Sequence, residues 1–390
     1  MGADPTRFAE RLGRSDLQCR ESVVWFHAAS LGEATQIASL VQHLIRSENV
    51  RVLVTTTTAA GADWVARKMP YVTHQFAPID TPGATERFLN RWSISAAVFV
   101  EGDLWPQLLG GLDKRGIPRI LLNARRSRTR ERFPAVFAAL LKPFALVTCR
   151  SDSIAEGMAA LGLASDRIHV LPDLRLTLPK LTISDEALSL LSLAVEKRPV
   201  WLAASTHPAD EEAVLTAHQE VLEAHPDTLL ILAPRHLNRG LPLQKLAQSA
   251  NLTAARRSLD EKVSAATQVY IADTLGELGI FFTLSPVTFL GGSFGQEGGH
   301  NPYEPVCFET ALLYGPHVAN FAEAYKALSR AGAAEKVGDP EHLGRTVVRL
   351  LRSDEARKIG QAGLAFWNDS QDCTVNYAEL VAGVLKRPAA

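Results

Sequence analysis

Cysteines are few in this 390-residue chain, and the four present lie far apart, at positions 19, 149, 307 and 373. There is no Cys-x-x-Cys pair and no metal-ligand spacing, which argues against a structural zinc and fits a reducing compartment. No stretch reaches the roughly 18 apolar residues of a membrane span, and no signal peptide opens the chain. The pattern thus excludes a disulfide framework and gives no sign of a membrane-spanning segment.

The chain also lacks an excess of charge of either sign, since Lys and Arg number 41, Asp and Glu number 42, and the net charge is −1. Such a balance gives no reason to expect a nucleic-acid partner. The local exception is the run 125–132, which holds five arginines in eight residues. Two interpretations of this run stay open: a solvated helix start, or a patch that faces an anion.

Three nucleotide-binding signatures are missing. There is no Gly-x-Gly-x-x-Gly after the first expected strand and no Gly-x-x-x-x-Gly-Lys-Ser/Thr. The glycine-rich loops that bind phosphate in dinucleotide-binding and P-loop proteins are therefore missing. Nor is there an Asp-x-Asp, which disfavours a metal-clamped diphosphate sugar. A phosphate held by arginine and backbone N–H groups remains compatible with the sequence.

What the sequence does contain is an alternation of short apolar strands and amphipathic helices. In the first half we expect strands at 23–26, 51–54, 96–100, 117–122 and 145–148, separated by helices near 59–69, 84–92, 105–115, 129–141 and 152–161. A break rich in proline at 173–199 leads to a second series of strands at 199–204, 228–233, 268–271 and 287–290, and the chain is expected to be helical after residue 340. At 390 residues, two α/β Rossmann-like domains with parallel sheets and a cleft between them are predicted.

Polar residues follow the expected strands of the first half, where a parallel sheet binds its ligands. Glu33 falls in the first turn of a helix and Asp103 follows the strand 96–100. Glu33 alone is explained by the helix dipole. Two carboxylates that converge on one edge instead suggest acid–base or cation-stabilising work, and both interpretations stay open.

In the second half, Arg235 offers a fixed cation for a phosphate and Gly276 lets the backbone approach a flat base. The glycine-rich stretch 291–299 is expected to turn N–H groups outward, towards a helix that starts near residue 301 or 302. Glu304 could accept hydrogen bonds from ribose. The histidines at 207, 236 and 300 are each compatible with ordinary buried histidines, but three of them beside strand ends favour a site.

Taken together, nine motifs in this order over residues 25–325 resemble the 3-deoxy-D-manno-oct-2-ulosonic acid (Kdo) transferases of lipid A biosynthesis, glycosyltransferase family 30. The motifs are HAASLGE, TTTTAAG, EGDLWP, NARRS, ASTH, PRH, DTLGEL, GGSFGQEGGHNPYEP and GPHVANF. The resemblance implies a GT-B fold, CMP-Kdo as donor, lipid IVA as acceptor, inversion at the transferred carbon, and neither metal nor cofactor. It further implies an acceptor domain at 1–175, a CMP-sugar domain at 176–355, and helices at 356–390 that pack back on the first domain.

The same resemblance assigns roles to individual residues. Glu33 matches the general base, Asp103 matches a carboxylate that supports the transition state, and Arg175 replaces a lysine of the family. The donor-binding residues it implies are Pro234, Arg235, Leu275, Gly276, Glu277, Ser293, Gly298, Gly299, Asn301 and Glu304. Those expected to face the acceptor or lipid are Ser30, Gly32, Arg125, Arg126 and Arg128.

Three departures from the family pattern stand out. Asp103 replaces a glutamate, and Pro172-Asp173-Leu174-Arg175 replaces Gly-Asn-Leu-Lys. The apolar, basic membrane anchor with which the family commonly begins is not found ahead of the segment at 7–13, so we expect a shortened form or one that docks differently. The resemblance still implies peripheral contact with the cytoplasmic face of the bacterial inner membrane. The alternatives are another GT-B enzyme that uses a UDP-sugar, and a catalytically silent nucleotide-sugar binding protein.

Overall fold

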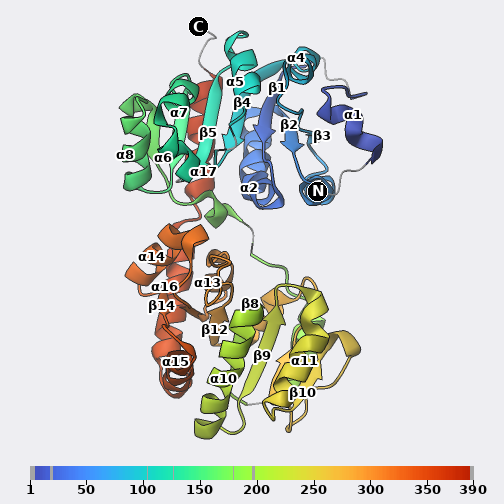
Figure 1. Cartoon of the computed structure of the whole chain (residues 1–390), viewed down its shortest axis with the longest axis vertical. Coiled ribbons are helices and arrows are strands. Elements are labelled where there is room, and N and C mark those ends of the chain that lie inside the picture. Colours follow the sequence, from blue (N-terminus) through green and yellow to red (C-terminus); the bar gives the residue numbers. More distant parts are fainter. Residues whose placement is uncertain are drawn as a thin grey trace. The chain divides into compact units, whose positions relative to one another are not determined.

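The computed structural model describes residues 5–17, 21–102, 104–125, 127–178, 180–195 and 198–386. The chain divides into two compact units (Figure 1). Unit 1 comprises Met1–Pro179 together with Ser370–Ala390, and unit 2 comprises Lys180–Asp369. Each unit has its own sheet and its own core.

The described part of unit 1 is built on a seven-stranded sheet with the order β3-β2-β1-β4-β5-β6-β7, in which all paired strands are parallel. Its central strands are buried along their whole length, since helices cover both faces, and this explains their nearly continuous apolar sequences. The strands are β1 (Val23–His27), β2 (Arg51–Thr56), β3 (Thr73–Phe76), β4 (Ile94–Val100), β5 (Arg119–Ala124), β6 (Leu146–Cys149) and β7 (Ile168–Val170).

The helices of unit 1 pack on both faces of this sheet (Figure 1). They are α1 (Phe8–Arg11), α2 (Leu31–Glu48), α3 (Ala59–Lys68), α4 (Pro82–Arg91), α5 (Pro106–Asp113), α6 (Arg128–Arg132), α7 (Pro134–Leu141), α8 (Asp152–Ala160) and α17 (Cys373–Leu385). The single helix expected over 129–141 is wrong, because it is interrupted at Phe133. Pro134 lacks an N–H donor and disfavours helical geometry in the residue before it, so α6 ends and α7 begins at this point.

The described part of unit 2 repeats the architecture with a second parallel sheet of seven strands, in the order β10-β11-β9-β8-β12-β13-β14. Its core includes the fully buried Trp201 and Phe289. The strands are β8 (Val200–Thr206), β9 (Leu229–Pro234), β10 (Ala254–Arg256), β11 (Val269–Ile271), β12 (Val287–Leu290), β13 (Ala311–Tyr314) and β14 (Ala334–Lys336). The helices are α9 (Asp185–Val195), α10 (Pro208–Ala224), α11 (Gly240–Ser249), α12 (Leu278–Leu284), α13 (Tyr303–Val306), α14 (Ala322–Arg330), α15 (Pro340–Arg352) and α16 (Glu355–Asp369).

The expected division of the last helices is corrected by the structure. Only α17 packs on unit 1, where it contacts α2, whereas α16 belongs to unit 2 and packs on β13 and α13. Glycines make this contact possible, since a Cβ at Gly360 would collide with the carbonyl oxygen of Glu309 and one at Gly363 would crowd Val306. The first boundary likewise falls after Pro179 rather than after residue 175. Of the helices in the described ranges, none is long and apolar enough to span a bilayer.

Candidate active site

In unit 1 the predicted base lies where β1 leads into α2, at the carboxyl edge of the sheet. The side chain of Ser30 caps α2 by accepting a hydrogen bond from the backbone N–H of Glu33 at 3.3 Å. The half-buried Glu33 carboxylate in turn accepts from the N–H of Ala29, with 2.6 Å between nitrogen and Oε2. Glu33 therefore stabilises the start of the helix, in agreement with the structural role that the helix dipole suggested. Its carboxylate also lies at the edge of the sheet where ligands bind. The neighbouring Gly32 is exposed.

A second carboxylate at this edge, Glu101, is buried with 6% of its surface exposed and follows β4. Its backbone φ is +60°, a left-handed conformation that turns the chain sharply at the strand end. The carboxylate accepts from Gln36 Nε2 at 2.9 Å and pairs with Arg175. Arg125 also approaches it, with 3.4 Å between Nε and Oε2.

This contact continues into a buried chain of polar side chains. The amide of Asn123 donates to Gln36 Oε1 at 2.9 Å and to Asp173 Oδ1 at 3.0 Å. Asp173 also accepts from Arg150 at 3.2 Å and pairs with Arg175 at 3.4 Å. Arg175, predicted as a catalytic residue, thus joins the two buried carboxylates Glu101 and Asp173.

The sequence prediction missed most of this network. Gln36, Asn123 and Asp173 were not among the predicted site residues, although each is at least 95% buried. One available signal was the position of Asn123 directly at a strand end, where a polar residue has no packing role. Two buried carboxylates facing three guanidiniums rigidify this edge, because each charged group is held by several partners.

Other predicted residues of unit 1 can be placed only in part. Asp103 and Arg126 lie outside the described residues, and of Arg128 only the backbone is described, as the first residue of α6. Arg125 is described, and its side chain is 59% exposed.

In unit 2 a buried carboxylate holds the glycine-rich stretch that follows β12. Asp210, completely buried in the first turn of α10, accepts from the backbone N–H of His207 at 2.9 Å and of Gly292 at 2.7 Å. The N–H groups of Ser293 and Phe294 also donate to it, at 3.2 and 2.9 Å. The expectation that the stretch turns its N–H groups outward is therefore wrong for residues 292–294, because a carboxylate of the chain itself takes them.

Three further residues of this stretch that were predicted to bind the donor make contacts within the chain. Ser293 is fully buried; its hydroxyl donates to the carbonyl of Leu290 at 2.7 Å and accepts from the N–H of Gly315 at 2.9 Å. Gly298 and Gly299 have φ of +84° and +80°, and a Cβ on either would crowd the segment 318–320. Ser293, Gly298 and Gly299 thus fix the shape of the loop through contacts within the chain. The close approach of the segment 318–320 explains why glycine is found at 298 and 299.

Beside this loop, three histidines and one arginine come together, as the sequence suggested. His207 and His300 stack, with ring centroids 5.1 Å apart and 2.9 Å between their Nε2 atoms, and His236 meets His207 edge-on at 5.6 Å. Burial lowers the pKa of His300 to about 4, and electrostatic interactions with His207 and Arg235 act in the same direction. The exposed guanidinium of Arg235 has no ion pair with any residue that the structure describes.

The remaining predicted donor residues lie at the ends of β9, β11 and β12. Glu277 is paired with Arg257, whose Nη2 donates at 2.7 Å, and this hydrogen bond holds the pKa of the Glu277 carboxyl below its usual range. Leu275 is 86% exposed, and at Gly276 φ is +88° with open space around it. A flat ligand could approach the backbone at this point.

Asn301 and Glu304 flank the start of α13, and Pro234 is buried at the end of β9. Asn301 Oδ1 accepts from the N–H of Tyr303 at 3.2 Å, and its Nδ2 donates to Glu304 at 3.4 Å. Burial raises the pKa of Glu304, while the hydrogen bond from Asn301 and the charge of Arg235 oppose the rise.

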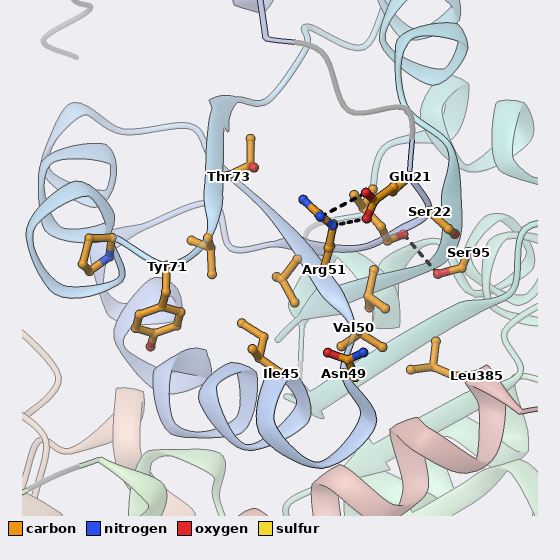
Figure 2. A pocket seen from close by; sticks show the side chains of 15 residues that line it. Glu21, Ser22, Ile45, Asn49, Val50, Arg51, Tyr71, Thr73, Ser95 and Leu385 are labelled. Carbon is orange, nitrogen blue, oxygen red and sulfur yellow. Dashed lines mark hydrogen bonds and ion pairs between the residues drawn. The ribbon is translucent and has the colours of Figure 1, made fainter.

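A cavity of about 860 Å³ opens at the amino ends of β1 and β2. Figure 2 shows the side chains that line it. Arg51 and Glu21, which are paired with each other at 3.0 Å, line it together with the half-exposed Tyr71. None of the predicted site residues lines this cavity. Because parallel sheets bind substrates at the opposite edge, we do not assign the active site to it.

Comparison with known proteins identifies the family. Residues 6–178 match the family model of 3-deoxy-D-manno-octulosonic-acid transferase (kdotransferase). The 3-deoxy-D-manno-octulosonic acid transferase of Rickettsia typhi is 33% identical over 345 residues, covering 87% of this chain and 74% of the relative. The chain belongs to the Kdo transferase family. The enzyme of the same name from Haemophilus influenzae is 31% identical over 395 residues, covering 98% of this chain and 92% of the relative.

Solved structures agree on the fold of this Kdo transferase. A glycosyltransferase from Rickettsia africae superposes with a TM-score of 0.66 at 10% identity, covering 95% of this chain and 100% of the other. At that identity the likeness concerns the fold alone, which is the GT-B fold with two parallel sheets. The predicted fold class is thereby confirmed. The prediction of a glycosyltransferase is confirmed by the family model and by the two Kdo transferase relatives.

Proposed function

We propose that this Kdo transferase moves Kdo from CMP-Kdo to lipid IVA in lipopolysaccharide assembly, with inversion at the transferred carbon and without a metal or cofactor. The observation that carries the proposal is 31% identity to a Kdo transferase across 98% of the chain. The same observation disfavours the alternative enzyme that uses a UDP-sugar. A catalytically silent protein is distinguished from an active one only by a turnover assay.

In this mechanism Glu33 is the general base. Its carboxylate takes the proton from the acceptor hydroxyl as that oxygen attacks the anomeric carbon, and the bond from that carbon to the phosphate oxygen breaks. CMP departs with the electron pair. The hydrogen bond from the Ala29 N–H and the amino end of α2 both stabilise the ionised carboxylate, which is the form a base requires. Asp103 is assigned to supporting the positive charge that develops on the sugar.

The role proposed for Arg175 is one of positioning rather than direct catalysis. It bridges Glu101 and Asp173 and so fixes the turns that follow β4 and β7. Its permanent positive charge takes the place of the lysine charge expected from the family. A guanidinium can, in addition, pair with two carboxylates at once.

The proposed donor site lies at the carboxyl edge of the sheet in unit 2. Arg235 would stabilise the departing phosphate of CMP, and its lack of a described ion-pair partner supports this role. The open backbone at Leu275 and Gly276 suits the cytosine base, and Glu304 with Asn301 suits the ribose hydroxyls. Glu277 holds this loop through Arg257.

Peripheral contact with the inner membrane is proposed for the surface around α6 and α7. Phe133 is 50% exposed and Val136 is 55% exposed, directly after the arginine run. Apolar side chains beside cations are typical of surfaces that lie on anionic lipid.

The test is a thermal shift of the purified chain against CMP, UMP, UDP, ADP and NAD at matched concentrations. A ligand at 100 times its dissociation constant adds about 2.7 kcal/mol to the stability of the folded state. A shift with CMP alone is expected, and transfer from CMP-Kdo to lipid IVA should follow. A shift with UDP and none with CMP would overturn the donor assignment, while CMP binding without turnover would select the silent protein.

A further inference from the structure

The side chain of Arg130 in α6 is buried beside apolar residues. Only 7% of its surface is exposed, and its guanidinium lies 5.9 Å from the centre of the Phe137 ring. Its Nη1 donates to the carbonyl of Arg125 at 3.1 Å and lies 3.8 Å from the sulfur of Met158. A Cβ at Gly102 would come within 2.7 Å of Nη2, so the side chain reaches the turn that follows Glu101.

Among the residues that the structure describes, no carboxylate compensates the charge of Arg130. Its Nε is buried without a hydrogen-bond partner, and no carboxylate of the described residues forms an ion pair with it. Arg119, which is buried to a similar degree, is paired with Asp113 at 2.5 Å. Burial lowers the pKa of Arg130, and Arg125 adds to the effect. Because a guanidinium stays charged in proteins, the site holds an unpaired buried cation, which is costly unless an anion joins it.

A cavity of about 450 Å³ opens beside this cation, within the range of small-molecule sites. Arg125, Ser127 and Ser153 add a second guanidinium and two hydroxyls to its lining, and Met158 and Ile154 add apolar wall. Glu131, which is exposed, is also part of the lining. The two guanidiniums and the two hydroxyls in the lining are hydrogen-bond donors, and such a set can bind an oxyanion that carries more than one negative charge.

We propose that this cavity binds a phosphate monoester, with Arg130 as the buried anchor and Arg125 as the exposed second cation. A dianion matches two guanidiniums, and the cavity can admit part of the molecule that carries the phosphate. Arg125 also contacts Glu101 at 3.4 Å, so the anion would be held beside the carboxyl edge where the acceptor is placed. The phosphate is therefore assigned to the acceptor sugar, a step that rests on the proposed function. Binding of a phosphate as such does not rest on it.

The first test compares sodium phosphate with sodium chloride at equal ionic strength, with the temperature of unfolding as the readout. We expect phosphate to raise this temperature in the unaltered chain and in the control Arg132→Met, which removes a charge from the same helix outside the cavity lining. In Arg130→Met the apparent dissociation constant of phosphate should rise about tenfold or more, as for the loss of one charge-assisted hydrogen bond. An undiminished response in Arg130→Met, or none in the unaltered chain, would overturn the site.

A second pair of variants covers the case in which Arg130→Met does not fold. Gly157 lines the cavity from the exposed side of α8, and a Cβ at this position meets open space. Gly157→Glu brings a carboxylate to the cavity and should abolish the response to phosphate. Gly157→Ala, which also raises the helix propensity but adds no charge, should keep the response to phosphate. Equal responses in the two variants would contradict the proposal.

Acceptor kinetics identify the source of the phosphate. With a phosphorylated acceptor, Arg130→Met should raise KM about tenfold and leave kcat nearly unchanged. With the dephosphorylated acceptor, the variant and the unaltered chain should have equal KM values. A loss restricted to binding of phosphatidylglycerol vesicles would overturn the cavity in favour of a lipid surface. If CMP neither binds nor supports transfer while the phosphate response still depends on Arg130, the proposed function fails and the anion site stands.

Discussion

The carboxylate of Asp210 accepts a hydrogen bond of 2.7 Å from the backbone N–H of Gly292, a residue 82 positions further along the chain. Through this contact the start of α10 fixes the loop that follows β12. Ser293 and Phe294 donate to the same carboxylate, so three successive N–H groups are satisfied by one side chain. The loop is held in shape before any ligand arrives.

Replacing Asp210 by Asn should destabilise unit 2 by about 3 kcal/mol, because the amide nitrogen faces N–H donors and the charge that strengthens the hydrogen bonds is lost. The free energy of unfolding, measured in urea, reports this loss. Glu212→Gln on the exposed side of the same helix is the control and should have little effect. Equal stability of the two variants would mean that the loop is held by other contacts.

The fold was largely predictable because its signal is local. Runs such as 287–290 are strands as expected, since continuous apolar residues of this length are typical of buried parallel strands. The strands that were not predicted include β7, β10 and β14, each of three residues. Such short strands carry too few residues for a periodic pattern, and neighbouring strands decide their pairing.

The candidate site was predictable only in part, because the contacts that shape it join distant segments. His207, His236 and His300 were expected to converge from their positions at strand ends, and they do. The role of Asp210 was not predicted, since nothing nearby in the sequence reveals a partner 82 residues away. The contact of Asn123 with Gln36 could not be predicted for the same reason, because 87 positions separate the two residues.

Glu33→Gln should reduce transfer about 100-fold or more, the lower range for loss of a general base. The folded state should be kept, because glutamine can also accept the hydrogen bond at a helix start. Initial rates of Kdo transfer measure the effect, and calorimetry should find CMP affinity unchanged. Glu48→Gln at the other end of α2 serves as the control. Turnover equal to that of the control would remove Glu33 from the mechanism.

Arg235→Ala should weaken CMP binding by about 1.5–3 kcal/mol, since a charge-assisted hydrogen bond to phosphate is lost. Titration calorimetry with CMP measures the change, and cytidine, which lacks the phosphate, should bind both forms equally. The exposed Arg345 on α15 provides a matched alanine control. If Arg235→Ala binds CMP as tightly as that control, the phosphate lies elsewhere.

His218 should make the enzyme less stable in acid. Its Nδ1 accepts from Trp201 Nε1 at 3.1 Å, so its proton is on Nε2, which donates to the carbonyl of Gln268 at 3.0 Å. Burial lowers the pKa of His218 from 6.5 to about 4, and the charge of Arg198 contributes in the same direction. The unfolded chain then binds the proton more readily than the folded one, and stability present above pH 6.5 is lost as the pH falls towards 4.

The expected loss from His218 is about 3 kcal/mol at most, and burial lowers the pKa values of His74 and His300 to about 4 as well, with further losses in the same direction. Urea unfolding at a series of pH values measures the slope. His218→Gln should flatten it, because glutamine keeps a donor and an acceptor but takes up no proton, whereas the exposed His317→Gln should leave it unchanged. A slope in His218→Gln as steep as in the unaltered chain would show that His218 is protonated without cost, and that the hydrogen bond from Trp201 does not hold it neutral.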